Sequence, residues 1–123
     1  MSERRLVLMA VVFGVLGFAC LIAAHYVGEW EMAKSINALR TDAGGCIAAK
    51  DWKGAFAACR ELDKKKLGRR WACAIRGECF DRMDRLPEAL VQYQAADALG
   101  DDTARDSAID VLKRMQRAQK GGE

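Results

Sequence analysis

The chain has 123 residues, a formal net charge of +3 and a single proline. This length allows one small domain in addition to a membrane anchor, and the small net charge, with both signs interspersed, does not indicate a nucleic-acid partner. No sustained run alternates β-branched and polar residues in the way that strands do, so we expect an all-α fold.

Residues 1–5 form a short polar start, and residues 6–27 are an almost unbroken apolar run. A helix needs roughly 20 apolar residues to cross the core of a bilayer, so this run predicts one transmembrane helix in contact with lipid. A cleaved secretion signal and a lipoprotein signal ending at Cys20 are the alternatives. Gly14 and Gly17 are candidate contacts for a partner helix, although glycine is common in membrane helices.

The charges on either side of the apolar run predict its orientation. Arg4 and Arg5 precede the run, whereas Glu29 and Glu31 are the first charges after it. Positive flanks stay in the cytoplasm. We therefore expect a cytoplasmic N-terminus, a helical connector over residues 28–35, and a C-terminal domain that is periplasmic or otherwise extracytoplasmic.

The rest of the chain contains an internal repeat of about 34 residues. Small residues align with small ones and bulky residues mostly with bulky ones: Ala43 with Gly77, Cys46 with Phe80, Trp52 with Leu86, Ala55 with Ala89, Cys59 with Tyr93, and Leu62 with Ala96. This pattern resembles the tetratricopeptide repeat (TPR) family. The resemblance covers residues 36–103 and implies two TPR-like helical hairpins, over 36–69 and 70–103. A capping helix over 104–120 and a tail over 121–123 would follow. The first copy has cysteines where the family has aromatic residues, and Asp101 replaces the usual proline.

Local signals place the turns and caps of these helices. Residues 50–53 and 84–86 are expected to be the turns inside the two copies, and Pro87 suits the first position of the helix that follows. Gly100 would end that helix, and Asp101 or Asp102 would cap the last one. Gly44-Gly45 either bend their helix or allow a neighbour to approach closely, and the small-residue position of the family beside them favours close packing. Residues 64–68 form a basic turn, either simply solvated or a patch for acidic lipids or a partner.

Four cysteines follow the apolar run, at positions 46, 59, 73 and 79. An even number of cysteines in an oxidising compartment predicts disulfides. The hairpin arrangement that the resemblance implies favours the pairs Cys59–Cys73 and Cys46–Cys79. Four reduced, buried cysteines are the alternative. A zinc site is not supported, because this region has neither a Cys-x-x-Cys pair nor a histidine.

No catalytic set can be assembled, because the lone histidine, His25, lies at the membrane edge. We therefore expect neither an enzyme nor a cofactor, and predict a binding function. In the TPR family the first helix of each repeat lines a concave groove. Transferred to this chain, the groove residues are Asn37, Arg40, Gly44, Ile47, Trp71, Ala74, Glu78, Asp81, Arg105, Ala108, Leu112 and Met115, with Trp71 as the expected anchor of a partner.

These observations favour a membrane-anchored adaptor or scaffold for protein–protein interaction. An alternative of a different class is a small structural subunit of a larger membrane complex, held mainly through its transmembrane helix. A redox-responsive protein that uses Cys73 or Cys79 is a third hypothesis. An N-terminal anchor followed by repeats also resembles mitochondrial import receptors, whose domain faces the cytosol, and that orientation would predict reduced cysteines.

Overall fold

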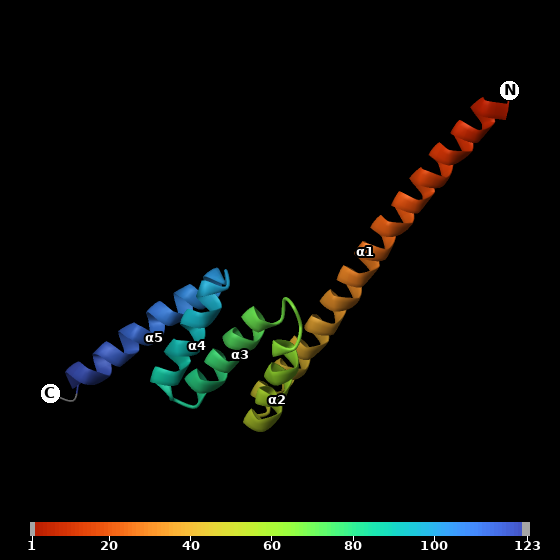
Figure 1. Ribbon diagram of the computed structural model, residues 1–123. Helices are drawn as coiled ribbons and strands as arrows, with labels where there is room; N and C mark the ends of the chain where they lie inside the picture. The colour runs from red at the N-terminus through yellow and green to blue at the C-terminus, as the bar shows by residue number, and fades with distance from the viewer. Residues whose placement is uncertain (1, 122–123) are drawn as a thin grey trace. The chain divides into compact units, whose positions relative to one another are not determined.

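The computed structural model describes residues 2–121 and contains, over this range, five helices and no strand (Figure 1). The prediction of an all-helical chain with one long apolar N-terminal helix is confirmed. The helices are α1 (Ser2–Ala48), α2 (Trp52–Asp63), α3 (Arg69–Arg82), α4 (Leu86–Ala98) and α5 (Asp102–Gly121).

The chain divides between residues 35 and 36 into two compact units, and α1 contributes to both. The first unit is the N-terminal part of α1, whose apolar stretch makes it a candidate membrane-spanning helix by length and composition. Within this unit nothing lies within 4 Å of a Cβ built on Gly14 or Gly17. Where the apolar stretch ends, His25 Nε2 lies 3.1 Å from Glu29 Oε1.

In the second unit consecutive helices pack side by side, α2 on α3, α3 on α4, and α4 on α5 (Figure 1). The buried residues of this unit include two clusters that join the helices. The α1–α3 cluster consists of Ile47, Ala55 and Cys79. The larger α3–α5 cluster consists of Cys73, Ala89, Tyr93, Ala96, Ala104, Ala108 and Val111. Because α3 contributes to both clusters, it is the central helix of this unit.

The backbone of the second unit repeats every 34 residues. Helix α1 ends at Ala48 and α3 at Arg82, while α2 begins at Trp52 and α4 at Leu86. The turn residues Lys50 and Asp84 both have φ of 59°, a left-handed conformation that is uncommon for residues other than glycine. The same hydrogen bond closes each turn, from Asp51 N to Cys46 O at 2.7 Å and from Arg85 N to Phe80 O at 2.8 Å. The two turns are therefore equivalent in conformation.

Side chains and glycine set the helix ends where the sequence suggested. Asp101 Oδ1 accepts a hydrogen bond from Ala104 N at 3.1 Å, so Asp101 rather than Asp102 caps α5. Pro87 occupies the first turn of α4, where its missing N–H is not needed. Gly100 follows α4 with φ of 98°, which glycine adopts readily.

The close approach expected at Gly44-Gly45 is wrong. A Cβ at either glycine would meet nothing within 4 Å. A close approach to the side chain of a neighbouring helix occurs instead at Gly77, where a Cβ would lie 2.7 Å from Cδ1 of Tyr93. Gly77 is thus the position at which the ring of a neighbouring helix requires the absence of a side chain.

The four cysteines of the second unit are free thiols, so neither expected disulfide is present. Cys46 packs against the cluster that contains Cys79, as the second expected pair requires, yet both remain unbridged. Cys59 and Cys79 are fully buried and Cys73 is 6% exposed. These thiols occupy the positions of small apolar core residues, which is a common environment for cysteine.

Candidate binding groove

Two neighbouring hollows follow the length of α3, with volumes of about 740 Å³ and about 560 Å³. They share four lining residues: Ala74, Glu78, Asp101 and Thr103. We therefore treat them as one continuous feature, called the groove below. Its walls come mainly from the C-terminal part of α1, from α3 and from residues 103–114 of α5.

Helices α1 and α3 contribute equivalent positions to the groove. The lining residues of α1 are Asn37, Arg40, Thr41, Gly44 and Ile47. Those of α3 are Trp71, Ala74, Ile75, Glu78, Asp81 and Arg82. The first five residues from α3 each lie 34 positions after one from α1. Residues at spacings of three and four share a helix face, so the same face of each helix is turned toward the groove.

The structure places all eight groove residues expected on α1 and α3 along the groove, whereas the four expected on α5 lie elsewhere. Ala108 and Met115 are packed in or against the α3–α5 cluster. Arg105 is paired with Asp97 on α4, with 3.0 Å between Nε and Oδ1, and Leu112 is exposed. In their place α5 contributes Thr103, Ala104, Ser107, Asp110 and Arg114.

The physical reason for this difference is a change of register in α5. Helix α3 begins at Arg69 and α5 at Asp102, one residue earlier than a strict 34-residue period requires. One residue corresponds to a rotation of about 100° in an α-helix. Extending the period of the first two copies therefore selects the wrong face of α5.

Trp71 lies at one end of the groove and is stacked against two arginines. The guanidinium carbon of Arg40 is 3.6 Å from the centre of a Trp71 ring, and that of Arg70 is 4.5 Å away. Guanidinium groups bind aromatic faces at such distances. Arg40 Nη1 also donates to Asn37 Oδ1 at 3.4 Å. At this end of the groove, the guanidinium cation of Arg40 is thus stacked on the indole ring of Trp71.

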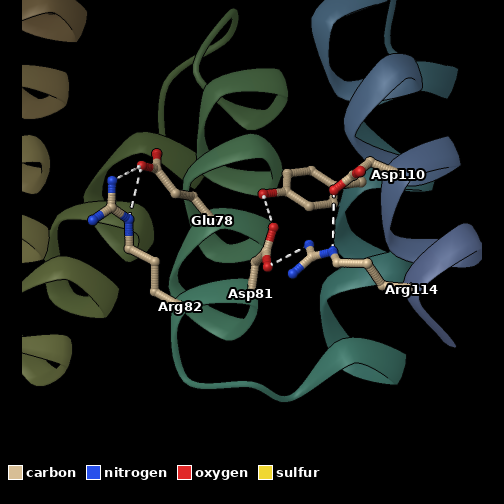
Figure 2. Close-up of polar contacts among 6 residues, drawn as sticks. Glu78, Asp81, Arg82, Asp110 and Arg114 are labelled. Atoms are coloured by element: carbon tan, nitrogen blue, oxygen red, sulfur yellow. Dashed lines mark hydrogen bonds and ion pairs between the residues drawn. The ribbon is translucent and has the colours of Figure 1, made fainter. Parts of the chain in front are cut away.

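The other end of the groove is a polar cluster that joins α3, α4 and α5 (Figure 2). Asp81 accepts hydrogen bonds from Arg114 Nη2 at 2.6 Å and from the hydroxyl of Tyr93 at 3.3 Å. Arg114 Nε lies 3.1 Å from Asp110 Oδ2. Beside this cluster Arg82 Nε donates to Glu78 Oε1 at 3.2 Å. The carboxylates of Asp81 and Glu78 are therefore already engaged by arginines.

These contacts keep Tyr93 and Arg114 protonated. Burial, followed by the negative charges of Asp81 and Glu78, raises the pKa of Tyr93, so its hydroxyl stays protonated and can donate. The hydrogen bond to Asp81 raises the pKa of Arg114, which stays charged. The cluster fixes three helices relative to one another and forms a rigid, polar end of the groove.

The thiols are poorly suited to redox or nucleophilic chemistry. Burial raises the pKa of Cys59 to about 12 and that of Cys79 to about 11, and it also raises the pKa of Cys73. Only the thiolate is a good nucleophile or metal ligand. Among residues 2–121 no group of three or more His, Cys, Asp and Glu side chains is arranged to hold a metal ion.

Sequence reasoning missed the α5 side of the groove and the central position of Arg114. The spacing of Asp110 and Arg114, four residues apart, is a visible signal for a helical ion pair. Nothing in the sequence connects Arg114 to Asp81, because their contact depends on the register of α5. Compared with known proteins, the chain matches no family model, and it has no significant similarity to a curated protein or a solved structure.

Proposed function

We propose that this protein is a membrane-anchored adaptor of the TPR type, which holds an extended segment of a protein partner in the groove. The observation that carries the proposal is the groove itself, which is continuous along α3 and lined by equivalent positions of α1 and α3. A surface built by the repetition of one helix face is the usual binding surface of stacked helical repeats.

Three features of the second unit support the TPR assignment. The 34-residue period recurs in the helix ends and in the turn conformation. Ala55 and Ala89, at equivalent positions of the second helices, are both fully buried. Helix α5 has a buried face that includes Val111 and an outer face that is mostly polar, as a capping helix requires.

The lining of the groove suits a peptide segment better than a small apolar ligand. Ile47, Ala74 and Ile75 form an apolar floor, and polar groups such as Thr41 and Thr103 alternate with it. An extended peptide offers both apolar side chains and unpaired backbone groups, which this mixture can accommodate. Trp71 with Arg40 would serve as the anchor of the partner, since Trp and Arg are enriched among the residues that dominate binding energy.

The apolar stretch of α1 would anchor the domain in a membrane as a single span. The flanking charges favour a cytoplasmic N-terminus and an extracytoplasmic domain. A fusion of the C-terminus to a reporter that is active only outside the cytoplasm tests this orientation. Activity is expected with the complete chain, and activity that moves to a cytoplasmic reporter would reverse the orientation.

Site-specific crosslinking tests the groove. A photoreactive residue is introduced at Thr41 or Ala74, inside the groove, and at Leu112, which a strict 34-residue period assigns to the groove but the structure places outside it. We expect a crosslinked protein partner from Thr41 and Ala74 in native membranes, and none from Leu112. The Trp71→Ala variant is expected to reduce the yield at both groove positions.

The same experiment distinguishes the structural-subunit alternative. Photoreactive residues at Gly14 and Gly17 report partners of the membrane helix. Crosslinks from these two positions that are unaffected by Trp71→Ala, together with none from Thr41 or Ala74, would replace the adaptor with a subunit held through α1.

A further inference from the structure

One end of the helical domain carries a patch that is both basic and apolar. Six residues surround a hollow of about 360 Å³ where the α2–α3 connection meets the C-terminal end of α4: Lys66, Leu67, Arg69, Arg70, Trp71 and Leu99. Together with Lys64 and Lys65 we call them the basic patch. Two of its apolar side chains face solvent, since Leu67 is 67% exposed and Leu99 is 45% exposed.

The charge of the basic patch is only weakly compensated by neighbouring carboxylates. No carboxylate is among the residues that line the hollow in the described part of the chain. The last turn of α2 contains two carboxylates: Glu61 is paired with Lys64 at 3.0 Å, and Asp63 is paired with Arg76 of α3. Lys66 and Arg69 are exposed, so these two cations face solvent together with Leu67 and Leu99.

Chain connectivity places this end of the domain within reach of the proposed anchor. Trp71, at the edge of the patch, contacts Arg40 near the start of the second unit. Only residues 28–35 separate this unit from the apolar run. Eight residues extend over about 12 Å as a helix and over at most about 28 Å when fully extended. The turns at Lys50 and Asp84 lie at the opposite ends of their helices.

We propose that the basic patch binds the surface of an anionic lipid bilayer. Its lysines and arginines would contact lipid phosphates, while Leu67 and Leu99 enter the headgroup region, the combination by which interfacial segments bind membranes. Each basic side chain near an anionic surface increases membrane affinity about fivefold. The inference rests on the proposed anchor in α1, which supplies the membrane, and is independent of whether the groove binds a protein.

The complete chain, reconstituted into nanodiscs, provides the test. Discs of phosphatidylcholine alone are compared with discs that also contain phosphatidylglycerol, each with a gadolinium chelate on some headgroups. Paramagnetic relaxation of backbone amides is measured at residues 64–70 and, as an internal reference, at residues 49–53. Incorporation of the chain into both kinds of disc is verified first, because failure there concerns the anchor and not the patch.

We expect the relaxation at residues 64–70, relative to residues 49–53, to be several-fold stronger in the anionic discs and to fall at high salt, which screens exposed charges. The charge reversal Lys64→Glu, Lys65→Glu and Lys66→Glu is expected to abolish this difference. The matched reversal Lys50→Glu and Lys53→Glu, at the other end of the domain, should leave it unchanged.

Equal relaxation in neutral and anionic discs would overturn the proposal, and so would a signal that survives the Lys64–Lys66 reversal. The salt titration of the unmodified chain keeps the test decisive even if the triple variant fails to fold. Leu67→Glu provides a second route, because a buried carboxylate opposes insertion, and retention of the full signal in this variant would likewise contradict the inference.

Discussion

The two helical hairpins of this protein have equivalent turns, but the side chains at their equivalent buried positions differ in size. The first, formed by α1 from residue 36 onward and by α2, places Ala43 and Cys59 at two fully buried positions. The second, formed by α3 and α4, places Gly77 and Tyr93 at the equivalent positions, with the tyrosine ring against the glycine. Two small residues in one hairpin thus correspond to one very small and one very large residue in the other.

A second difference concerns the polar contacts of the two hairpins. Ile47, in the first, is buried and apolar, whereas the equivalent residue of the second hairpin, Asp81, binds Tyr93 and Arg114. The second hairpin therefore fixes its helices by a specific ring contact and a hydrogen-bonded ion pair. The comparison indicates that the same turn and the same 34-residue period can accommodate different side chains in the two hairpins. The condition is that a larger side chain at one position is accompanied by a smaller one at the neighbouring position.

The largest effect should come from removing the ring that distinguishes the second hairpin. Tyr93→Ala is expected to lower the free energy of unfolding by about 3–5 kcal/mol, the usual effect of deleting a buried aromatic ring. Cys59→Ala, at the equivalent position, removes only one sulfur atom and should cost about 1 kcal/mol. Urea unfolding of the complete chain in mild detergent, followed by circular dichroism, measures both. Equal losses would mean that the two hairpins are not packed differently.

A matched pair of glycine substitutions sharpens the comparison. In Gly77→Ala the added Cβ would meet the ring of Tyr93 at 2.7 Å, so we expect a loss of about 1–3 kcal/mol. In Gly45→Ala the Cβ meets nothing within 4 Å, and the helix should gain about 1 kcal/mol. The same unfolding assay measures both the expected loss and the expected gain in the free energy of unfolding. A stabilising Gly77→Ala would be inconsistent with the ring contact.

The buried thiols predict a loss of stability at alkaline pH. Burial raises the pKa of Cys59 to about 12 and that of Cys79 to about 11, above the ordinary value of 9.0. The unfolded chain therefore releases these protons at a lower pH than the folded chain. The contribution of the two thiols to the free energy of unfolding is fully present below pH 9.0. Above it stability falls by about 1.4 kcal/mol per pH unit for each thiol, until the folded thiols also ionise.

The double variant Cys59→Ala and Cys79→Ala separates this contribution from that of Tyr93, whose pKa is also raised by burial. Unfolding free energies measured at several alkaline pH values should decrease less steeply in the variant than in the unmodified chain. Identical slopes would show that the thiols ionise as readily in the folded state as in the unfolded one.

The smallest change in the free energy of unfolding is expected from breaking the ion pair between Asp81, in the second hairpin, and Arg114, on α5. Arg114→Met leaves Asp81 with the hydroxyl of Tyr93 as its remaining donor, and should cost about 1 kcal/mol because both partners are partly exposed. Arg105→Met removes a more exposed pair, with Asp97, and should cost less than about 0.5 kcal/mol. Differential scanning calorimetry can rank the two variants. A larger loss in Arg105→Met would contradict the role assigned to Arg114.

The helical class and several helix ends could be predicted because they depend on local chemistry. Asp101, Pro87 and Gly100 act through the conformation of one or two residues, so their effect is visible in the sequence. The lining residues that α1 and α3 contribute to the groove could also be predicted, because the same helix face recurs after 34 residues. These positions required no knowledge of how distant residues meet.

The remaining features depend on packing that a linear pattern does not contain. The face of α5 turned toward the groove is set by a one-residue change of register after α4. The free thiols follow from how the side chains of the helices are placed in the core, and spacing alone does not determine whether two cysteines can bond. Gly44 and Gly77 illustrate the same limit, because the position of Tyr93 decides which of these two glycines is needed for close packing.

The register of α5 has a consequence for the natural variation of this domain. A residue inserted into or deleted from a helix rotates every later residue of that helix by about 100° relative to the residues before it, so a length change inside α1, α3 or α5 would turn lining residues away from the groove. The surface connections between helices tolerate such changes far better. A second copy of residues 36–69, placed after residue 69, would instead keep every helix face in phase, because residues 36 and 70 are equivalent positions of the 34-residue period and the copy ends at the existing junction between residues 69 and 70. Growth of the domain by such a whole repeat would therefore preserve the groove.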